Sequence, residues 1–220
     1  GLLASPMGVL VSLTTRGNRS ALVKSQNLME KLTREVRSRL GEWLFAEGRD
    51  TMEEVVGREL IKRGLMLAVA ESCTGGLIGH RLTQVAGSSA YVDRGAVCYS
   101  NRAKTEMLGV PADLIVLRGA VSGEVAAAMA SGIRERANVS VGLSVTGIAG
   151  PGGGTEAKPV GLVYVGLDDG TGRPIAREFR FHGDRNVIKQ RSSQAALDVL
   201  RRWLVDKTKR DGRDLREKRD

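Results

Sequence analysis

The chain has 220 residues, of which 41% are hydrophobic and 4% aromatic, and its formal net charge is +9. This length and apolar content suffice for one domain of ordinary size with a small additional module. No apolar run approaches the roughly 20 residues that a membrane-spanning helix requires, so we expect no membrane partner. The scarcity of aromatic residues argues against a platform on which nucleic-acid bases stack.

The positive charge is unevenly spread along the chain. Residues 1–50 hold 8 basic and 5 acidic residues, residues 51–200 hold 17 and 15, and residues 201–220 hold 9 and 5. Because the middle is nearly balanced, we expect no specific nucleic-acid partner. Two histidines and two well-separated cysteines give no paired ligand spacing, so no metal is expected. The low cysteine count favours a reduced, cytoplasmic protein.

The first fifty residues read as a small α+β module. Residues 8–15 have the pattern of a strand, and residues 20–40 that of a helix with one apolar side. Residues 48–50 form a link. A second helix is predicted to begin at Thr51 and to end at Gly64, with Met52 and Leu60 on its inward face.

A turn with the sequence AESCTGG joins the next two predicted elements. Residues 65–70 form a continuous apolar run, typical of a strand covered on both faces, and apolar residues from Leu77 onward repeat at helical spacing. Ser72 therefore lies near a helix N-terminus, where free N–H groups and the helix dipole favour an anion. The alternative is that Ser72 or Thr74 only caps the helix, which is the commoner role of these residue types.

A second strand-to-helix junction adds a phenol and an amine. Residues 95–100 are predicted to form a strand and residues 101–108 a helix, with Tyr99 and Lys104 near their junction. The carboxyl ends of neighbouring parallel strands meet at one edge of a sheet, so Ser72 could meet both side chains there. Lys104 could act as a base toward Ser72 only if its pKa is lowered; otherwise it is a counter-ion or a solvated surface charge.

A glycine-rich loop follows a third strand. Residues 139–145 are strand-like, and residues 146–155 contain glycines that let backbone amides approach a ligand closely. The loop lacks the Gly-Lys-Ser/Thr ending of a nucleotide-binding P-loop, and Pro151 follows its GXXG where a nucleic-acid-binding KH helix would begin. A flexible connector is the alternative.

The remaining pattern completes an α/β fold. We predict a helix over residues 122–137 capped by Ser122, adjacent strands over 160–167 and 175–181, and a closing helix from Asp184 to Val205. Residues 207–220 are charged throughout and are expected to be disordered. The predicted architecture is a three-layer α/β/α sandwich, with helices on both faces of a mostly parallel mixed sheet and an antiparallel pair near one edge.

Five segments in this order resemble the C-terminal domain of the CinA (competence/damage-inducible) family: AESCTGG, GAVCYSNRAK, LGVP, GAVS and VTGIAGPGGGTEAKPVG. The resemblance runs from about Thr51 to Val205 and implies a domain over residues 51–206. Residues 1–50 resemble the last part of the family's KH-like middle domain. Standalone relatives of the C-terminal domain are nicotinamide mononucleotide amidohydrolases, which implies a small-molecule nucleotide substrate, no cofactor and a homodimer.

The resemblance also assigns roles to residues. It makes Ser72 the nucleophile, Lys104 its activating base and Tyr99 their catalytic neighbour. Cys73 as a thiol nucleophile ranks below Ser72. The substrate-binding residues that it implies are Cys73, Thr74, Gly75, Asn101, Thr146, Gly147, Arg185 and Arg191. Two positions depart from the family pattern: Cys98 replaces another small residue, and Lys189 stands where arginine is common, so Arg191 is the substitute for an arginine clamp on the phosphate.

The function implied is deamidation of nicotinamide mononucleotide to nicotinic acid mononucleotide and ammonia through an acyl-enzyme on Ser72. Helix N–H groups after Ser72 would stabilise the tetrahedral oxyanion. The alternative, from a different class, is a non-catalytic nucleotide- or phosphate-binding module of a longer CinA-like protein.

Overall fold

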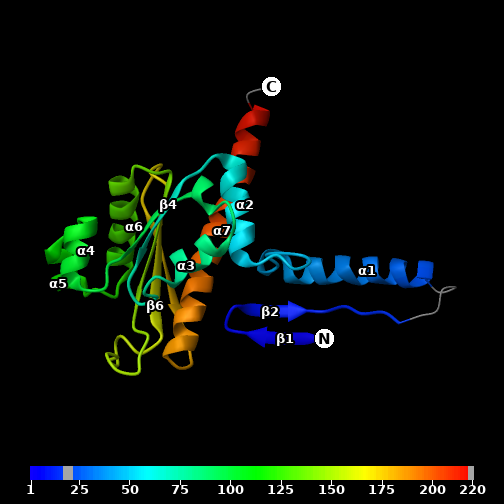
Figure 1. Ribbon diagram of the computed structural model, residues 1–220, viewed down its shortest axis with the longest axis horizontal. Coiled ribbons are helices and arrows are strands. Elements are labelled where there is room, and N and C mark those ends of the chain that lie inside the picture. The colour runs from blue at the N-terminus through cyan, green and yellow to red at the C-terminus, as the bar shows by residue number, and fades with distance from the viewer. Residues whose placement is uncertain (17–21, 218–220) are drawn as a thin grey trace. The chain divides into compact units, whose positions relative to one another are not determined.

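The computed structural model describes residues 1–16 and 22–217, and the side chains of residues 1–16 and 23–207 (Figure 1). The chain divides into two compact units, Gly1–Asp50 and Thr51–Asp220. In the first unit, β1 (Leu2–Ser5) pairs antiparallel with β2 (Gly8–Val11), and α1 (Leu22–Leu40) and the 3₁₀ turn η2 (Gly41–Trp43) follow. The sequence pattern did not predict β1, and the predicted helix start at residue 20 lies outside the described residues.

The second unit is built on a five-stranded sheet with the order β4-β3-β5-β6-β7. Central β3 pairs parallel with both β4 and β5, whereas β6 runs antiparallel to its neighbours β5 and β7. This confirms the predicted mostly parallel mixed sheet with antiparallel pairing near one edge. The strands are β3 (Leu67–Glu71), β4 (Val92–Val97), β5 (Val141–Gly147), β6 (Leu162–Asp168) and β7 (Ile175–Arg180).

Helices cover both faces of this sheet, as the three-layer prediction requires (Figure 1). One face carries α4 (Asn101–Leu108), α5 (Ala112–Arg118) and α6 (Gly123–Ala137). The other carries α2 (Met52–Arg63), α3 (Leu77–Gln84) and α7 (Arg185–Glu217). Helix α6 approaches the sheet closely, because a Cβ added at Gly142 would lie 2.1 Å from the Ala130 carbonyl oxygen.

Local signals in the sequence set several helix ends. Thr51 and Glu54 form a reciprocal capping box at the start of α2, and Gly64 ends the helix in the left-handed region at φ +61°. Ser122 and Ser100 accept hydrogen bonds from the first-turn amides of α6 and α4. These helices therefore begin where the sequence predicts. The short helix α5 was not predicted.

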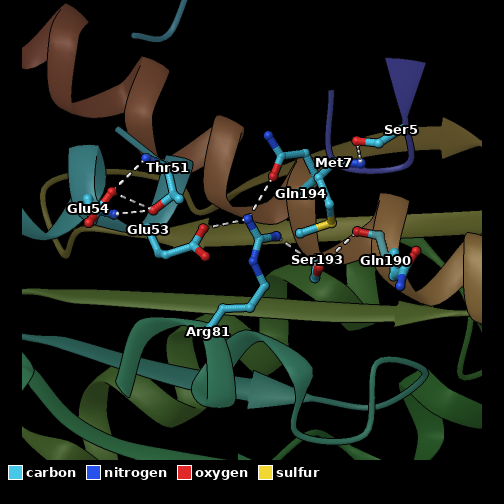
Figure 2. Close-up of polar contacts among 9 residues, drawn as sticks. All are labelled: Ser5, Met7, Thr51, Glu53, Glu54, Arg81, Gln190, Ser193 and Gln194. Atoms are coloured by element: carbon cyan, nitrogen blue, oxygen red, sulfur yellow. Dashed lines mark hydrogen bonds and ion pairs between the residues drawn. The ribbon is translucent and has the colours of Figure 1, made fainter. Parts of the chain in front are cut away.

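Arg81 joins the three helices on the α2–α3–α7 face (Figure 2). Its Nη2 lies 2.7 Å from Glu53 Oε2 on α2 and 2.7 Å from Gln194 Oε1 on α7, and Nη1 donates to Ser193 Oγ at 3.0 Å. The side chain is buried, so this layer has a polar cross-link inside it as well as an apolar contact surface.

The last helix corrects one expectation. Helix α7 continues to Glu217, whereas the sequence analysis ended it at Val205 and expected disorder from residue 207. An established helix extends by one hydrogen bond for each residue it fixes, and Lys, Arg and Glu have favourable helix propensity, so a charged segment can prolong a helix that began in the core. No helix in the described residues is long and apolar enough to cross a membrane.

Candidate active site

The site lies where three parallel strands end at the same level. Glu71, the last residue of β3, is in register with Val97 on β4 and Val145 on β5. Ser72 follows directly, and its N–H donates to the Val145 carbonyl at 3.0 Å. The junctions that the sequence analysis singled out after β3, β4 and β5 therefore converge at one edge of the sheet.

Lys104 reaches Ser72 from the neighbouring junction. It lies on α4, close to the Ser100 cap, and its side chain is only 1% exposed. Its Nζ is 3.0 Å from Ser72 Oγ, 2.9 Å from the Cys98 carbonyl oxygen and 3.1 Å from the Tyr99 carbonyl oxygen. The structure thus brings together a hydroxyl and an amine that are 32 residues apart in sequence.

The three neighbours of Lys104 Nζ can accommodate either form of the amine. The carbonyl oxygens of Cys98 and Tyr99 accept two N–H groups, and the Ser72 hydroxyl can accept the third N–H of an ammonium or donate to the lone pair of a neutral amine. Burial lowers the pKa of Lys104 below its ordinary value of 10.5. Lys104 forms no ion pair with any carboxylate in the described part of the chain.

The two thiols near the site are poorly suited to nucleophilic attack. Burial raises the pKa of Cys73 to about 12, so the thiol stays protonated near neutral pH. Burial also raises the pKa of Cys98. A protonated thiol is a weak nucleophile, which favours Ser72 over Cys73.

Glu71 corrects the expected role of the α3 N-terminus. Its buried carboxylate accepts hydrogen bonds from the Thr74 hydroxyl at 2.6 Å and from the backbone N–H groups of Gly76, Ile78 and Gly79 at 2.8–3.1 Å. These helix amides are therefore not available to a substrate oxyanion or phosphate. Neither Ser72 nor Thr74 is the helix cap, since α3 begins at Gly76 without a side-chain cap.

Tyr99 contributes differently from the expectation. Its carbonyl oxygen contacts Lys104, whereas its phenol is 59% exposed and accepts a hydrogen bond from Arg185 Nη2 at 3.0 Å. Arg185 Nη1 also donates to the Gly150 carbonyl at 2.8 Å. Arg185 thereby connects the β4 end with the glycine-rich loop after β5.

The other residues assigned by resemblance are held by their own neighbours. Thr146 is buried and donates from Oγ1 to the Ala120 carbonyl at 2.9 Å, and Gly147 packs against Val163. Asn101 is exposed at the start of α4, and Arg191 Nη1 donates to the His182 carbonyl at 2.8 Å. None of the side-chain hydrogen bonds found in residues 23–207 links these four to Ser72 or Lys104.

A cavity of about 440 Å³ lies beside the Ser72 turn. Lys189 lines it, and Nζ of this residue lies 3.7 Å from where a Cβ at Gly75 would be, with no hydrogen-bond or ion-pair partner among the described residues. Sequence reasoning had favoured Arg191 as the cation here. The signal that identifies Lys189 is its position one helical turn after Arg185. The lining residues are Thr74, Gly75, Gly76, Leu77, His80, Asn186, Lys189 and Gln190.

Fold and site together define an α/β protein with a buried serine–lysine pair at the carboxyl edge of its sheet. The family model described as the CinA C-terminal domain matches residues 49–204, so the chain belongs to the CinA family. A CinA-like protein of Citrifermentans bemidjiense is 52% identical over 185 residues, which are 84% of this chain and 44% of that protein. The chain spans about half the length of the curated relatives that it matches.

Solved structures of the family share this fold. The competence/damage inducible protein CihA from Agrobacterium tumefaciens is similar with a TM-score of 0.65 and 42% identity, over 70% of this chain and 97% of that one. A competence-damaged protein (CinA) superfamily protein from Klebsiella pneumoniae 700603 gives a TM-score of 0.67 at 31% identity, over 71% and 99% of the two chains. These likenesses cover the sheet and its helices.

Proposed function

We propose that the chain is an amidohydrolase that removes ammonia from the carboxamide of nicotinamide mononucleotide. The observation that carries this proposal is the 3.0 Å contact between Ser72 Oγ and a buried Lys104 Nζ whose other neighbours are two carbonyl oxygens. A lysine base needs a partner that can donate a proton to it.

The first half of the reaction forms an ester on Ser72. Neutral Lys104 takes the hydroxyl proton as Ser72 Oγ bonds to the carboxamide carbon, and the carbonyl oxygen becomes an oxyanion. Among the described residues, the Cys73 and Thr74 N–H groups of this turn have no acceptor in another residue, so we assign the oxyanion to them. Protonated Lys104 then returns its proton to the carboxamide nitrogen, and ammonia leaves as the carbon–nitrogen bond breaks.

The second half regenerates the serine. Lys104 takes a proton from a water molecule, whose oxygen attacks the ester carbon. The bond to Ser72 Oγ breaks, Ser72 recovers its proton from Lys104, and nicotinic acid mononucleotide is released. The cationic pyridinium of the substrate makes the carboxamide carbon more electrophilic, and it also disfavours a second positive charge on Lys104.

The neighbouring cavity supports a nucleotide as substrate. Its volume of about 440 Å³ is within the usual range for small-ligand sites, and Thr74 and Gly75 of the Ser72 turn line it, although Ser72 and Lys104 do not. Lys189 supplies a cation without a protein partner in the described residues, and Arg185 lies at the first residue of the same helix. We assign the substrate phosphate to Lys189, with Arg185 at the mouth of the site.

The test is ammonia release from nicotinamide mononucleotide by the purified chain. We expect turnover by the native chain and none above background with Ser72→Ala, while Ser72→Ala still binds the substrate in calorimetry. Cys73→Ala is the matched control, because it changes the adjacent side chain and leaves the serine. Turnover by Ser72→Ala would overturn the assignment of the nucleophile.

The same experiment distinguishes an enzyme from a non-catalytic binding module. Binding of nicotinamide mononucleotide by the native chain without any ammonia release would support a non-catalytic role. A binding role that places the phosphate at the α3 N-terminus is disfavoured, because Glu71 occupies these amides.

A further inference from the structure

The turn that carries Ser72 is held from inside by the carboxylate of Glu71. Oε2 accepts from the Thr74 hydroxyl at 2.6 Å, from Gly76 N–H at 3.0 Å and from Ile78 N–H at 3.1 Å, and Oε1 accepts from Gly79 N–H at 2.8 Å. Glu71 is only 1% exposed. One side chain at the end of β3 therefore fastens both the turn and the first turn of α3.

The hydrogen bonds of Glu71 are structural. Three donors approach its Oε2, and one approaches its Oε1. Its contacts are all with the protein's own turn and helix. Glu71 is adjacent to the nucleophile in sequence without being one of the reacting groups.

The turn needs such an anchor because of its own backbone. Gly75 and Gly76 adopt positive φ values of +62° and +97°, and Gly76, the N-cap residue of α3, has no side chain with which to cap the helix. Without Glu71, the buried amides of Ile78 and Gly79 would lose their acceptor, and the glycines would offer little resistance to other conformations. Ser72 Oγ meets Lys104 only while this turn keeps its shape.

We propose that Glu71 is a positioning residue that fixes Ser72 at attacking distance from Lys104 by occupying the α3 N-terminus with the protein's own carboxylate. The expected fall in kcat for ammonia release rests on the proposed function. The structural consequence of the proposal, a displaced Ser72 when the carboxylate is lost, holds for any chemistry at this site. It also explains why the substrate's anionic group must be bound by side-chain cations.

The test replaces the carboxylate by its isosteric amide. In Glu71→Gln, the amide NH₂ takes the place of one oxygen and faces an N–H donor, so the turn loses at least one hydrogen bond and gains a donor–donor contact. We expect kcat for ammonia release to fall about 100-fold, because small misplacements of reacting groups have effects of that size, while the substrate Kd changes less than about threefold.

Asp168→Asn is the matched control. Asp168 is also a buried carboxylate held by donors, Arg134 Nε at 2.9 Å and Gly170 N–H at 3.0 Å. Asp168 pairs with Gly142 near the N-terminal end of β5. It therefore lies at the other end of the strands from Ser72, which follows the carboxyl end of β3. We expect this variant to lose stability as Glu71→Gln does and to keep the native kcat in its folded fraction.

Thr74 provides a milder variant should Glu71→Gln not fold. Thr74→Val removes one donor to Glu71 at nearly constant volume, and we expect kcat to fall about tenfold. Thr74→Ser restores the hydroxyl and should restore kcat. A kcat for Thr74→Val equal to that of Thr74→Ser would overturn the proposal, since the hydroxyl contact with Glu71 would then have no effect on Ser72.

A crystal structure of Glu71→Gln separates this proposal from the proposed function. We expect the distance between Ser72 Oγ and Lys104 Nζ to lengthen beyond hydrogen-bond reach from its present 3.0 Å. An unchanged distance together with native kcat would overturn the positioning role. If the native chain releases no ammonia, the proposed function fails, and the measured distance alone then decides whether Glu71 positions Ser72.

Discussion

Two buried cations in this molecule have opposite surroundings. Arg81, 5% exposed, lies among helices α2, α3 and α7 and pairs with the Glu53 carboxylate, as Figure 2 shows. Lys104, 1% exposed, lies at the sheet edge and contacts a hydroxyl and two carbonyl oxygens. The Arg81 cross-link thus has a counter-charge, whereas Lys104 forms no ion pair among the described residues.

Under the proposed function, the difference separates a structural cation from a catalytic base. A guanidinium keeps its proton at any physiological pH, so its burial requires a carboxylate and strong hydrogen bonds. An amine can release its proton instead, and burial without a counter-charge favours that release. The comparison teaches that the partner of a buried cation indicates its role better than burial alone.

The largest expected effect comes from making Lys104 resemble Arg81. Lys104→Arg keeps a long cationic side chain but cannot supply a neutral base, so we expect ammonia release to fall about 10³- to 10⁴-fold. The reciprocal variant Arg81→Lys is the control and should retain turnover in its folded fraction. Substantial turnover by Lys104→Arg would show that the lysine is not the base.

Removing the counter-charge of Arg81 should affect stability next. In Glu53→Gln the buried guanidinium loses its carboxylate, and we expect the free energy of unfolding to drop by about 3–5 kcal/mol. Urea denaturation followed by circular dichroism measures the loss. A drop below about 1 kcal/mol would mean that Gln194 and Ser193 satisfy Arg81 by themselves.

A pH series sharpens the comparison further. Burial lowers the pKa of Lys104, so turnover should rise with pH as the amine loses its proton. The rising part of the pH–rate profile should lie below the ordinary lysine pKa of 10.5. Between the lowered native pKa and the unfolded value, the unfolded chain binds more protons. The Lys104 contribution to stability therefore rises with pH in that window, by at most about 1.4 kcal/mol per pH unit, whereas Cys73 and Cys98, whose pKa values burial raises from 9.0, contribute with the opposite sign.

The control for that slope is Lys104→Met, which removes the titrating group. We expect the slope of the free energy of unfolding against pH over this window to be lower in the variant than in the native chain, by the contribution of that one proton. Glu53→Gln should keep the native slope, because it leaves Lys104 in place. A slope unchanged in Lys104→Met would assign the effect to another group.

The smallest expected effect is that of the neighbouring thiol. Because burial raises the pKa of Cys73 to about 12, Cys73→Ala should keep turnover within about threefold and cost about 1 kcal/mol of stability, as for a small core residue. Ammonia assays and thermal unfolding measure the two quantities. Loss of turnover in Cys73→Ala with turnover retained in Ser72→Ala would make the thiol the nucleophile.

Much of the fold could be predicted from local sequence. Thr51, Ser100 and Ser122 start helices, and Gly64 ends one, as their side-chain and backbone chemistry predicts. The short helix α5 and strand β1 escaped prediction, since they lack a long periodic pattern. Helix α7 extends past Val205 because a helix that begins in the core can continue through a charged segment rich in Lys and Arg, although Asp211, Gly212 and Asp214 are poor helix formers.

The candidate site was harder to predict from the sequence than the fold. The order of motifs selected Ser72 and Lys104, but no pattern distinguishes Lys104 from other helix lysines. The exposed phenol of Tyr99 and the backbone partners of Thr146 and Arg191 could not be foreseen, since they depend on how loops meet. Glu71 stood in the quoted motif, yet its role required knowing where the α3 amides point.

The sequence by itself determined the elements, their layer arrangement and the strand ends at which polar groups gather, because caps, glycines and hydrophobic spacing act over a few residues. Only the tertiary structure decided which cation is paired and which is not. That outcome depends on contacts between segments 28 and 32 residues apart, and the pKa of a buried group is set by the neighbours that folding brings to it.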